Sequence, residues 1–341
     1  MPFNKNKPKI LVILTGGTIC SCEDSSGERS SQVNTAKYKI TSIFRESGSP
    51  YSDVEFDYLI STDILSENMT LKTWNKLLDG FKALGSAEEY RGIIILHGTD
   101  TLAYTSSLLS VALTHLNIPT ILVSAQLPLD NVGTNGNANF KAAVELIMNG
   151  IKPNVYAVYK NSDGNTYVHL GAHLKQCENF SDDFFSCDAY KIPDIDNAIW
   201  QGQAFEYKNN VINEFSHLKS GVISIVPYVG IDYDIFDLSN VSAVIHNTYH
   251  TTAVCVERSK KTGNYTNYSF LHFLDKCKER NVDVFLAPCD PEAYSYESTG
   301  DALSNGAMYI SGKTFELAYT KALVGYSMGL KGEALQTFIN N

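Results

Sequence analysis

The sequence predicts an α/β protein with a larger N-terminal domain and a smaller C-terminal α/β domain. Short runs of consecutive apolar residues alternate with segments of helical spacing, and this alternation stops once and then resumes. Uninterrupted apolar runs are typical of strands buried on both faces, which form parallel sheets with helices on both faces. We expect an N-terminal α/β domain at 1–195, a linker at 196–219 and a C-terminal α/β domain at 220–341.

The N-terminal part contains five apolar runs that predict strands and three segments that predict helices. The first run, KILVIL at 9–14, ends in a Thr-Gly-Gly turn, and GIIIL at 92–96 has no polar residue at all. In 69–84 the apolar residues recur three or four positions apart, and Thr70 is the expected N-cap. In chain order the predicted elements are strand 9–14, strand 56–61, helix 69–84, strand 92–96, helix 102–115, strand 119–125, helix 136–149 and strand 154–159.

The C-terminal part repeats the same pattern after an irregular stretch from about 190 to 218. That stretch has no regular apolar spacing, so we interpret it as the connection between the domains. The alternation then resumes, and the predicted elements are strands at 221–227, 241–246 and 282–287 and a terminal helix at 314–329 that ends at Gly329.

Composition excludes several classes of protein. The 341 residues are 44% hydrophobic and 19% charged, enough for a well-buried core, and the net charge is −10. An acidic surface repels phosphate backbones, and the densest basic patch, Arg258–Lys261, is short. We therefore expect no nucleic-acid partner.

Membrane insertion and secretion are also not expected. No apolar stretch reaches the length of a membrane-spanning helix, and the N-terminal run is too short for a secretory signal. The seven cysteines cannot all pair, and no CxxC pair or histidine-rich set indicates a zinc site. Free thiols in a reducing cytoplasm are the expectation.

Two polar turns follow buried strands. TGGT (Thr15–Thr18) follows 9–14, and HGTDT (His97–Thr101) follows 92–96. Ligands of open parallel sheets bind beyond the carboxyl ends of the strands, where both turns fall. Either turn alone is explained by an ordinary N-cap, and TGGT is not a phosphate loop because no Gly-Lys-Ser/Thr follows. The two together favour a site.

A hydroxyl in such a turn needs a base to become a nucleophile. A neutral lysine can serve, because burial lowers its pKa, whereas a nearby carboxylate stabilises the charged form. Asp100 is adjacent to Thr99, so a lysine brought close would complete a Thr–Lys–Asp group. Spacing alone does not identify that lysine.

The two turns in this order resemble those of the bacterial-type L-asparaginase family. TGGTI is followed by HGTDTLAYT, and SENMTLKTW (66–74), SAQLPL (124–129) and the tail STGDAL…ELAYTKAL also resemble family segments. The residues AYT after HGTDTL resemble the cytoplasmic type I branch of this family, and so does the expected lack of a signal peptide.

The resemblance implies catalytic roles for four residues. Thr18 would attack a side-chain amide carbonyl, and Thr99, Asp100 and Lys175 would form the second catalytic group. Lys175 lies in GAHLKQCENF, where the family has a threonine just before its lysine. A solvated surface lysine is the alternative interpretation of Lys175.

The resemblance also implies how the substrate binds. Ser66 and Glu67 would hold its α-carboxylate and α-ammonium, with Asp100 sharing the ammonium, and the backbone at Ala125 would accept hydrogen bonds from the leaving amide. Turn N–H groups would stabilise the oxyanion. Glu67 could also serve as a first-turn charge for the helix that begins near Thr70.

Two segments depart from the family pattern. The family's mobile N-terminal loop carries a tyrosine that would fall near Gly27–Glu28, but 20–35 has no tyrosine and Tyr38 is the first available. The segment 247–268 is longer and bulkier than the family's turn, and its His250 is a candidate ligand contact or a solvated loop residue.

The expected function is hydrolysis of L-asparagine to aspartate and ammonia through an acyl-enzyme. The alternatives are an amidase for another amide (glutamine, a D-amino-acid amide or a peptide-like amide) and a catalytically weak amino-acid-binding protein. A subunit that amidates charged tRNA is disfavoured by the acidic charge and by the absence of an added N-terminal domain. No metal or organic cofactor is expected, and the resemblance implies a dimer or tetramer with sites near a subunit interface.

Overall fold

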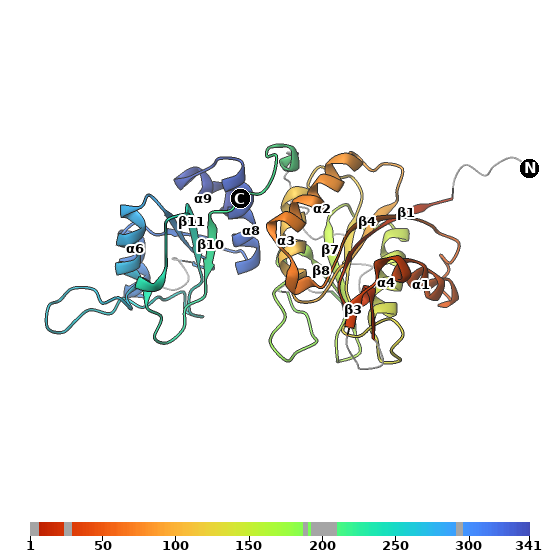
Figure 1. Cartoon of the computed structure of the whole chain (residues 1–341), viewed down its shortest axis with the longest axis horizontal. Coiled ribbons are helices and arrows are strands. Elements are labelled where there is room, and N and C mark those ends of the chain that lie inside the picture. The colour runs from red at the N-terminus through yellow and green to blue at the C-terminus, as the bar shows by residue number, and fades with distance from the viewer. Residues whose placement is uncertain (1–6, 24–28, 187–189, 192–209, 291–295) are drawn as a thin grey trace, which may run out of the picture. The chain divides into compact units, whose positions relative to one another are not determined.

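The computed structural model describes residues 7–23, 29–186, 190–191, 210–290 and 296–341. The chain divides into two compact units, Met1–Glu214 and Phe215–Asn341 (Figure 1). Each unit contains its own mainly parallel sheet, so the predicted α/β class is confirmed. Most of the expected linker, 196–209, lies outside the described residues.

The N-terminal unit is built on a seven-stranded sheet. Its strands are β1 (Lys9–Gly16), β4 (Glu55–Ile64), β5 (Gly92–Leu96), β6 (Thr120–Val123), β7 (Val155–Lys160), β8 (Thr166–Leu170) and β9 (Tyr190–Lys191). They lie in the order β4-β1-β5-β6-β7-β8-β9. The first five are parallel and correspond to the five predicted runs, whereas β8 and β9 are antiparallel additions at one edge that the sequence pattern did not predict.

Helices cover both faces of this sheet. Figure 1 shows α2 (Leu71–Leu84) and α3 (Leu102–Ala112) on one face and α1 (Val33–Glu46) and α4 (Gly136–Met148) on the other. Apolar side chains of α1 and α4 pack with alternate residues of β1 in one buried cluster. The three predicted helices are α2, α3 and α4; α1 was not predicted, although it buries an apolar face from Val33 to Phe44.

The ends of α2 follow the expected capping chemistry. The hydroxyl of Thr70 accepts a hydrogen bond from the Thr73 N–H at 3.3 Å, as expected of an N-cap. The helix ends at Gly85, whose φ of 68° lies in the region that favours glycine. This places Ser66 and Glu67 in the short connection between the end of β4 and α2.

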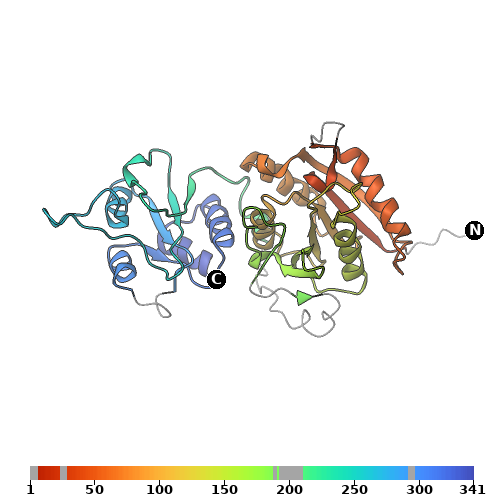
Figure 2. The ribbon, with the colours of Figure 1, turned by 90° about the horizontal axis from the view of Figure 1, so that it is seen from below.

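The C-terminal unit contains a second parallel sheet. Its elements are β10 (Val222–Ile225), β11 (Ala243–His246), α6 (Phe270–Glu279), β12 (Asp283–Leu286), α7 (Glu297–Ser304), β13 (Met308–Tyr309), α8 (Phe315–Ser327) and α9 (Gly332–Asn340). The strand order is β10-β11-β12-β13, and the three predicted strands all form. Figures 1 and 2 show α6 and α8 on opposite sides of this sheet. The predicted helix at 314–329 is α8, but its placement as the last element is wrong, because α9 follows a turn at Gly329 with a φ of 93°.

None of the helices in the described part of the chain is long and apolar enough to cross a bilayer.

Candidate active site

The order of the strands places most of the expected site residues at one end of the N-terminal sheet. β4, β1, β5 and β6 are neighbours and run parallel, so their carboxyl ends lie side by side. Thr18 follows β1, Ser66 follows β4, Thr99 follows β5 and Ala125 follows β6. Residues that follow adjacent parallel strands share one crevice, which is where ligands of such sheets bind.

The turns after β1 and β5 are in direct backbone contact through Gly17 and Gly98. A Cβ added to Gly17 would overlap the Cα and N of Gly98, and one added to Gly98 would lie 3.1 Å from the Cα of Gly17. Gly17 also has a φ of 78°, which side chains disfavour. Because Thr18 and Thr99 each follow one of these glycines, the contact brings the two threonine turns together.

The first threonine of TGGT has a structural role. The Thr15 hydroxyl donates to the Leu96 carbonyl at 2.9 Å, which ties β1 to the end of β5. The N–H of Gly17 donates to the Ile64 carbonyl at 2.8 Å, which ties the same turn to β4. Thr18, by contrast, is partly exposed at the start of the 3-10 helix η1 (Thr18–Cys20), and its hydroxyl makes no hydrogen bond within the described residues.

Ser66 connects the end of β4 to the turn after β5. Its hydroxyl donates to the Asp100 carboxylate at 2.9 Å and accepts from the Asp100 N–H at 3.1 Å. The Thr101 hydroxyl donates to the Ser66 carbonyl at 3.0 Å. Ser66 is buried while Asp100 is exposed, so the carboxylate is held in place and remains accessible. Thr101, which belongs to the predicted turn but was not among the predicted site residues, is therefore part of the support of the site.

His97 lies completely buried beneath this turn. Its Nδ1 donates to the Gly98 carbonyl at 2.7 Å, and burial lowers the pKa of the imidazole to about 4. The ring is therefore neutral at pH 7, with its proton on Nδ1. Within the described residues its Nε2 has no hydrogen-bond partner. Through this bond His97 holds the carbonyl of Gly98 in the turn.

Ala125 lies at the end of β6, where two asparagines of the α4 region hold the backbone. Asn139 donates through Nδ2 to the Ser124 carbonyl at 3.0 Å, and Asn135 accepts from the Gln126 N–H at 3.1 Å. Ala125 is fully buried. These side chains fix the backbone on both sides of Ala125, and neither asparagine was singled out from the sequence.

The segment that carries Lys175 reaches the site by an indirect route. β8 is antiparallel to β7, so its carboxyl end lies at the opposite end of the sheet, and Gly171 packs against Ser110 near the far end of α3. The chain then returns, and Gln176 donates through Nε2 to the Asp100 carbonyl. Gln176 was not expected at the site, because its partner is distant in sequence.

The side chain of Lys175 makes no hydrogen bond or ion pair with Thr99 or Asp100. Its side chain is exposed, and within the described part of the chain its ammonium group makes neither a hydrogen bond nor an ion pair. Its backbone N–H donates to the Phe185 carbonyl at 3.0 Å, so the position of its main chain is fixed. The neighbouring Gln176 nevertheless places this segment beside the Asp100 turn.

The side chains of the remaining described candidates are exposed. Glu67 is exposed in the short 3-10 helix Ser66–Asn68, and His250 is exposed in the loop after β11. Tyr38 is in α1 and its ring packs 6.3 Å from that of Tyr58, which directs it toward β4. The position near Gly27–Glu28, where the family's tyrosine would fall, lies mostly outside the described residues.

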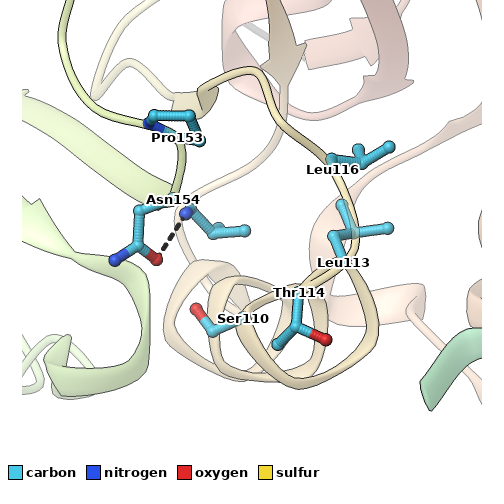
Figure 3. A pocket seen from close by; sticks show the side chains of 7 residues that line it. Ser110, Leu113, Thr114, Leu116, Pro153 and Asn154 are labelled. Carbon is cyan, nitrogen blue, oxygen red and sulfur yellow. Dashed lines mark hydrogen bonds between the residues drawn. The ribbon is translucent and has the colours of Figure 1, made fainter. Parts of the chain in front are cut away.

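A small cavity at the other end of α3 does not compete with this site. It lies between Ser110, Leu113 and Asn154, and Figure 3 shows that the side-chain amide oxygen of Asn154 accepts from a backbone N–H beside it. Its volume of about 40 Å³ has room for one or two water molecules and is too small for an amino acid. Within the described residues, no group of three His, Cys, Asp or Glu side chains is arranged to hold a metal ion.

Comparison with known families gives a match over most of the N-terminal unit. A family model described as asparaginase, N-terminal, matches residues 9–211. An L-asparaginase of Thermococcus kodakarensis is 30% identical over 187 residues, which cover 55% of this chain and 52% of that protein. The chain thus spans about half the length of this relative.

Other relatives carry a different name. A subunit of the glutamyl-tRNA(Gln) amidotransferase of Methanococcus maripaludis is 28% identical over 303 residues, or 84% of this chain and 68% of that protein. Among solved structures, L-asparaginase I of Vibrio cholerae superposes with a TM-score of 0.72 at 20% identity, covering 98% of both chains. The thermostable L-asparaginase of Thermococcus kodakarensis superposes with a TM-score of 0.71 at 21% identity, covering 98% of this chain and 97% of that chain. At these identities the structural likeness shows the fold alone.

Proposed function

Because the chain belongs to the asparaginase family, we propose that it hydrolyses the side-chain amide of L-asparagine to aspartate and ammonia. The observation that carries this proposal is the contact of Gly17 with Gly98, which brings the Thr18 turn against the Thr99–Asp100 turn. The bonds from Ser66 to Asp100 add a fixed carboxylate to the same crevice. Two hydroxyls and a carboxylate at one end of the sheet suit acyl transfer through a covalent intermediate.

The proposed reaction begins at Thr18. Its oxygen attacks the amide carbon and forms a tetrahedral intermediate, whose negative oxygen accepts from turn N–H groups. The proton of the hydroxyl passes to the Thr99–Lys175–Asp100 group and then to the leaving nitrogen, which departs as ammonia and leaves an ester on Thr18. Water then attacks the ester, and the hydroxyl of Thr18 is restored as aspartate leaves.

Lys175 takes part only after its side chain changes rotamer. The bond from Gln176 to the Asp100 carbonyl holds the main chain of this segment beside the catalytic turn. A lysine side chain has four rotatable bonds, so the ammonium can turn from solvent toward Asp100 without a change in the fold. We propose that the bound substrate, by excluding water, favours this rotamer.

The ends of the substrate account for selectivity in this proposal. The Ser66 hydroxyl turns its proton from Asp100 to the α-carboxylate of the substrate, and Glu67 holds the α-ammonium, which Asp100 shares. The backbone at Ala125 accepts from the departing amide. A plain amide that lacks both charged ends cannot make these contacts. The protein would act without a cofactor, as a cytoplasmic homo-oligomer whose sites lie near a subunit interface.

A second candidate function is release of ammonia for transfer to another acceptor. It is favoured by the relatives named as subunits of glutamyl-tRNA(Gln) amidotransferases, one of which matches over 84% of this chain. This candidate uses the same nucleophile and differs in the fate of the ammonia. An activity with asparagine that needs no second protein would favour hydrolysis over transfer.

The proposal is tested by measuring ammonia release from L-asparagine, L-glutamine, D-asparagine and propionamide. We expect asparagine to be the best substrate and Thr18→Ala and Thr99→Ala each to lose at least about a hundredfold in kcat. Thr262→Ala, in an exposed loop of the C-terminal unit, is the matched control.

Two results would contradict the proposal. Parent activity in both threonine variants would remove the site assignment. Saturable binding of asparagine without turnover would assign the chain to the alternative of an amino-acid-binding protein.

A further inference from the structure

A second cavity lies wholly within the C-terminal unit, at the carboxyl ends of two of its strands. β10 and β11 are parallel neighbours, and the segments that follow them, Pro227–Ile231 and Tyr249, line the cavity. Its volume of about 350 Å³ falls within the range of small-molecule sites. The carboxyl ends of parallel strands are also where such sheets bind ligands.

The remaining walls come mainly from 247–268, the segment that departs from the family pattern. Cys255, Glu257 and Tyr268 line the cavity beside Tyr249. The Phe270 N–H donates to the Cys255 carbonyl at 2.7 Å, so this segment is fastened to the start of α6. Four of the lining residues therefore belong to the segment that departs from the family's turn.

Tyrosines dominate the lining. Tyr228, Tyr249 and Tyr268 are 54%, 40% and 44% exposed, so large parts of these side chains remain accessible. The fourth tyrosine, Tyr233, is buried. Its hydroxyl bonds to His246 Nε2 at 2.8 Å, and its ring stacks 4.8 Å from that of Phe273. Exposed aromatic rings gathered around a cavity mark a binding site.

The charge of the lining is negative. Glu257 is the one charged residue among the described lining residues. One of its oxygens accepts from the Thr266 hydroxyl at 2.7 Å, and the described residues give its other oxygen no partner. Arg258, next in sequence, does not neutralise it, because its guanidinium lies 4.0 Å over the ring of Tyr265 and donates to the Tyr265 hydroxyl.

We propose that this tyrosine-lined cavity binds a small organic cation, an alkyl- or quaternary ammonium. Aromatic faces attract such cations through their quadrupoles, and a single carboxylate supplies the opposite charge. A net charge of −10 further favours cationic ligands over anionic ones. The inference does not depend on the proposed amide hydrolysis, because every residue that carries it lies in the C-terminal unit.

The test compares choline with 3,3-dimethylbutan-1-ol, its neutral carbon isostere, by calorimetric titration of the full chain. We expect choline to bind at least about fivefold more tightly, because the cation–π and charge terms act on the ammonium alone. Glu257→Gln and Tyr249→Leu should each weaken choline binding at least about fivefold. The matched controls, Glu333→Gln in α9 and Tyr309→Leu in β13, should leave it unchanged, and circular dichroism verifies that each variant is folded.

Three results would overturn the inference. Equal affinity for choline and the alcohol would show that the cavity binds apolar groups and does not recognise the positive charge. Unchanged choline binding in both cavity variants would place the cation elsewhere. Binding that appears only when dilution produces monomers would assign this face to a second copy of the chain.

Discussion

The hydroxyl of Ser66 and the carboxylate of Asp100 lie 2.9 Å apart, although they belong to turns that follow different strands. The same hydroxyl accepts from the Asp100 N–H at 3.1 Å. One buried side chain thus holds both the backbone and the carboxylate of Asp100 in the turn after β5. The geometry of Asp100 is consequently set before any substrate arrives, which reduces the cost of ordering the site during binding.

Removal of this hydroxyl should affect both binding and stability. In Ser66→Ala the Asp100 N–H and carboxylate lose their partner, so we expect KM for asparagine to rise about tenfold and the free energy of unfolding to fall by about 1–2 kcal/mol. Ammonia-release kinetics and denaturant unfolding measure the two effects. Ser304→Ala, an exposed serine of α7, should change neither by much. Parent KM in Ser66→Ala would show that the hydroxyl does not organise the site.

The contact between the two glycine turns can be tested against backbone strain alone. Gly17 and Gly48 have similar φ angles of 78° and 72°, but an added Cβ would clash with Gly98 at the first and meet nothing within 4 Å at the second. We expect Gly48→Ala to cost about 1 kcal/mol and Gly17→Ala at least about 2 kcal/mol more. Urea unfolding of both variants gives the comparison. Equal losses would mean that the turns can separate without cost.

Substitution of Lys175 should lower activity while leaving the stability of the fold nearly unchanged. Its side chain is exposed, so Lys175→Met should change the free energy of unfolding by less than about 0.5 kcal/mol. If the ammonium turns toward Asp100 in the substrate complex, kcat should nevertheless fall at least about a hundredfold. Lys219→Met, in the C-terminal unit, is the control for the charge change. An active Lys175→Met enzyme would exclude the lysine from the mechanism.

Acid should destabilise the fold through His97. Burial lowers the pKa of His97 to about 4 from its ordinary 6.5. Above pH 6.5 the residue is neutral in both states and contributes nothing to the pH dependence. Between pH 6.5 and 4 the unfolded chain binds a proton that the folded chain excludes, so stability falls on acidification, by on the order of 2–3 kcal/mol.

The variant His97→Asn removes this titration while keeping a side-chain donor near the Gly98 carbonyl. Its unfolding free energy should fall less steeply than that of the parent between pH 6.5 and 4, as measured by denaturant unfolding at several pH values. His246 has a similarly lowered pKa, so part of the slope should remain. Identical slopes in parent and His97→Asn would contradict the buried neutral state.

The fold could be predicted wherever an element's sequence pattern reflects its own burial. GIIIL at 92–96 is the strand β5 to the residue, because a strand buried on both faces must be apolar throughout. α1 was missed although Val33, Ala36 and Ile40 are spaced as in a helix, since polar residues separate them and no side-chain cap marks the start. The direction of β8 could not be predicted, because it depends on its pairing with β7 and not on its own residues.

In the candidate site, too, features with a local sequence pattern could be predicted and features that depend on distant contacts could not. The turns at Thr15–Thr18 and His97–Thr101 could be recognised because polar residues interrupt apolar strands there. The bond from Gln176 to Asp100 could not, because nothing local to Gln176 indicates a partner so far away in the chain. The family resemblance indicated Lys175, one position earlier, but the orientation of its side chain depends on the path that the chain takes after β8.

The bond between Gln176 and Asp100 also has a consequence for synthesis of the protein. Thr18 leaves the ribosome before the segment that carries Gln176, because it precedes that segment in the chain. A nascent or truncated chain that ends before this segment would carry Thr18 and Asp100 without the side chain that bonds to the Asp100 carbonyl. We therefore expect the crevice to become competent late in translation, when this segment has been added.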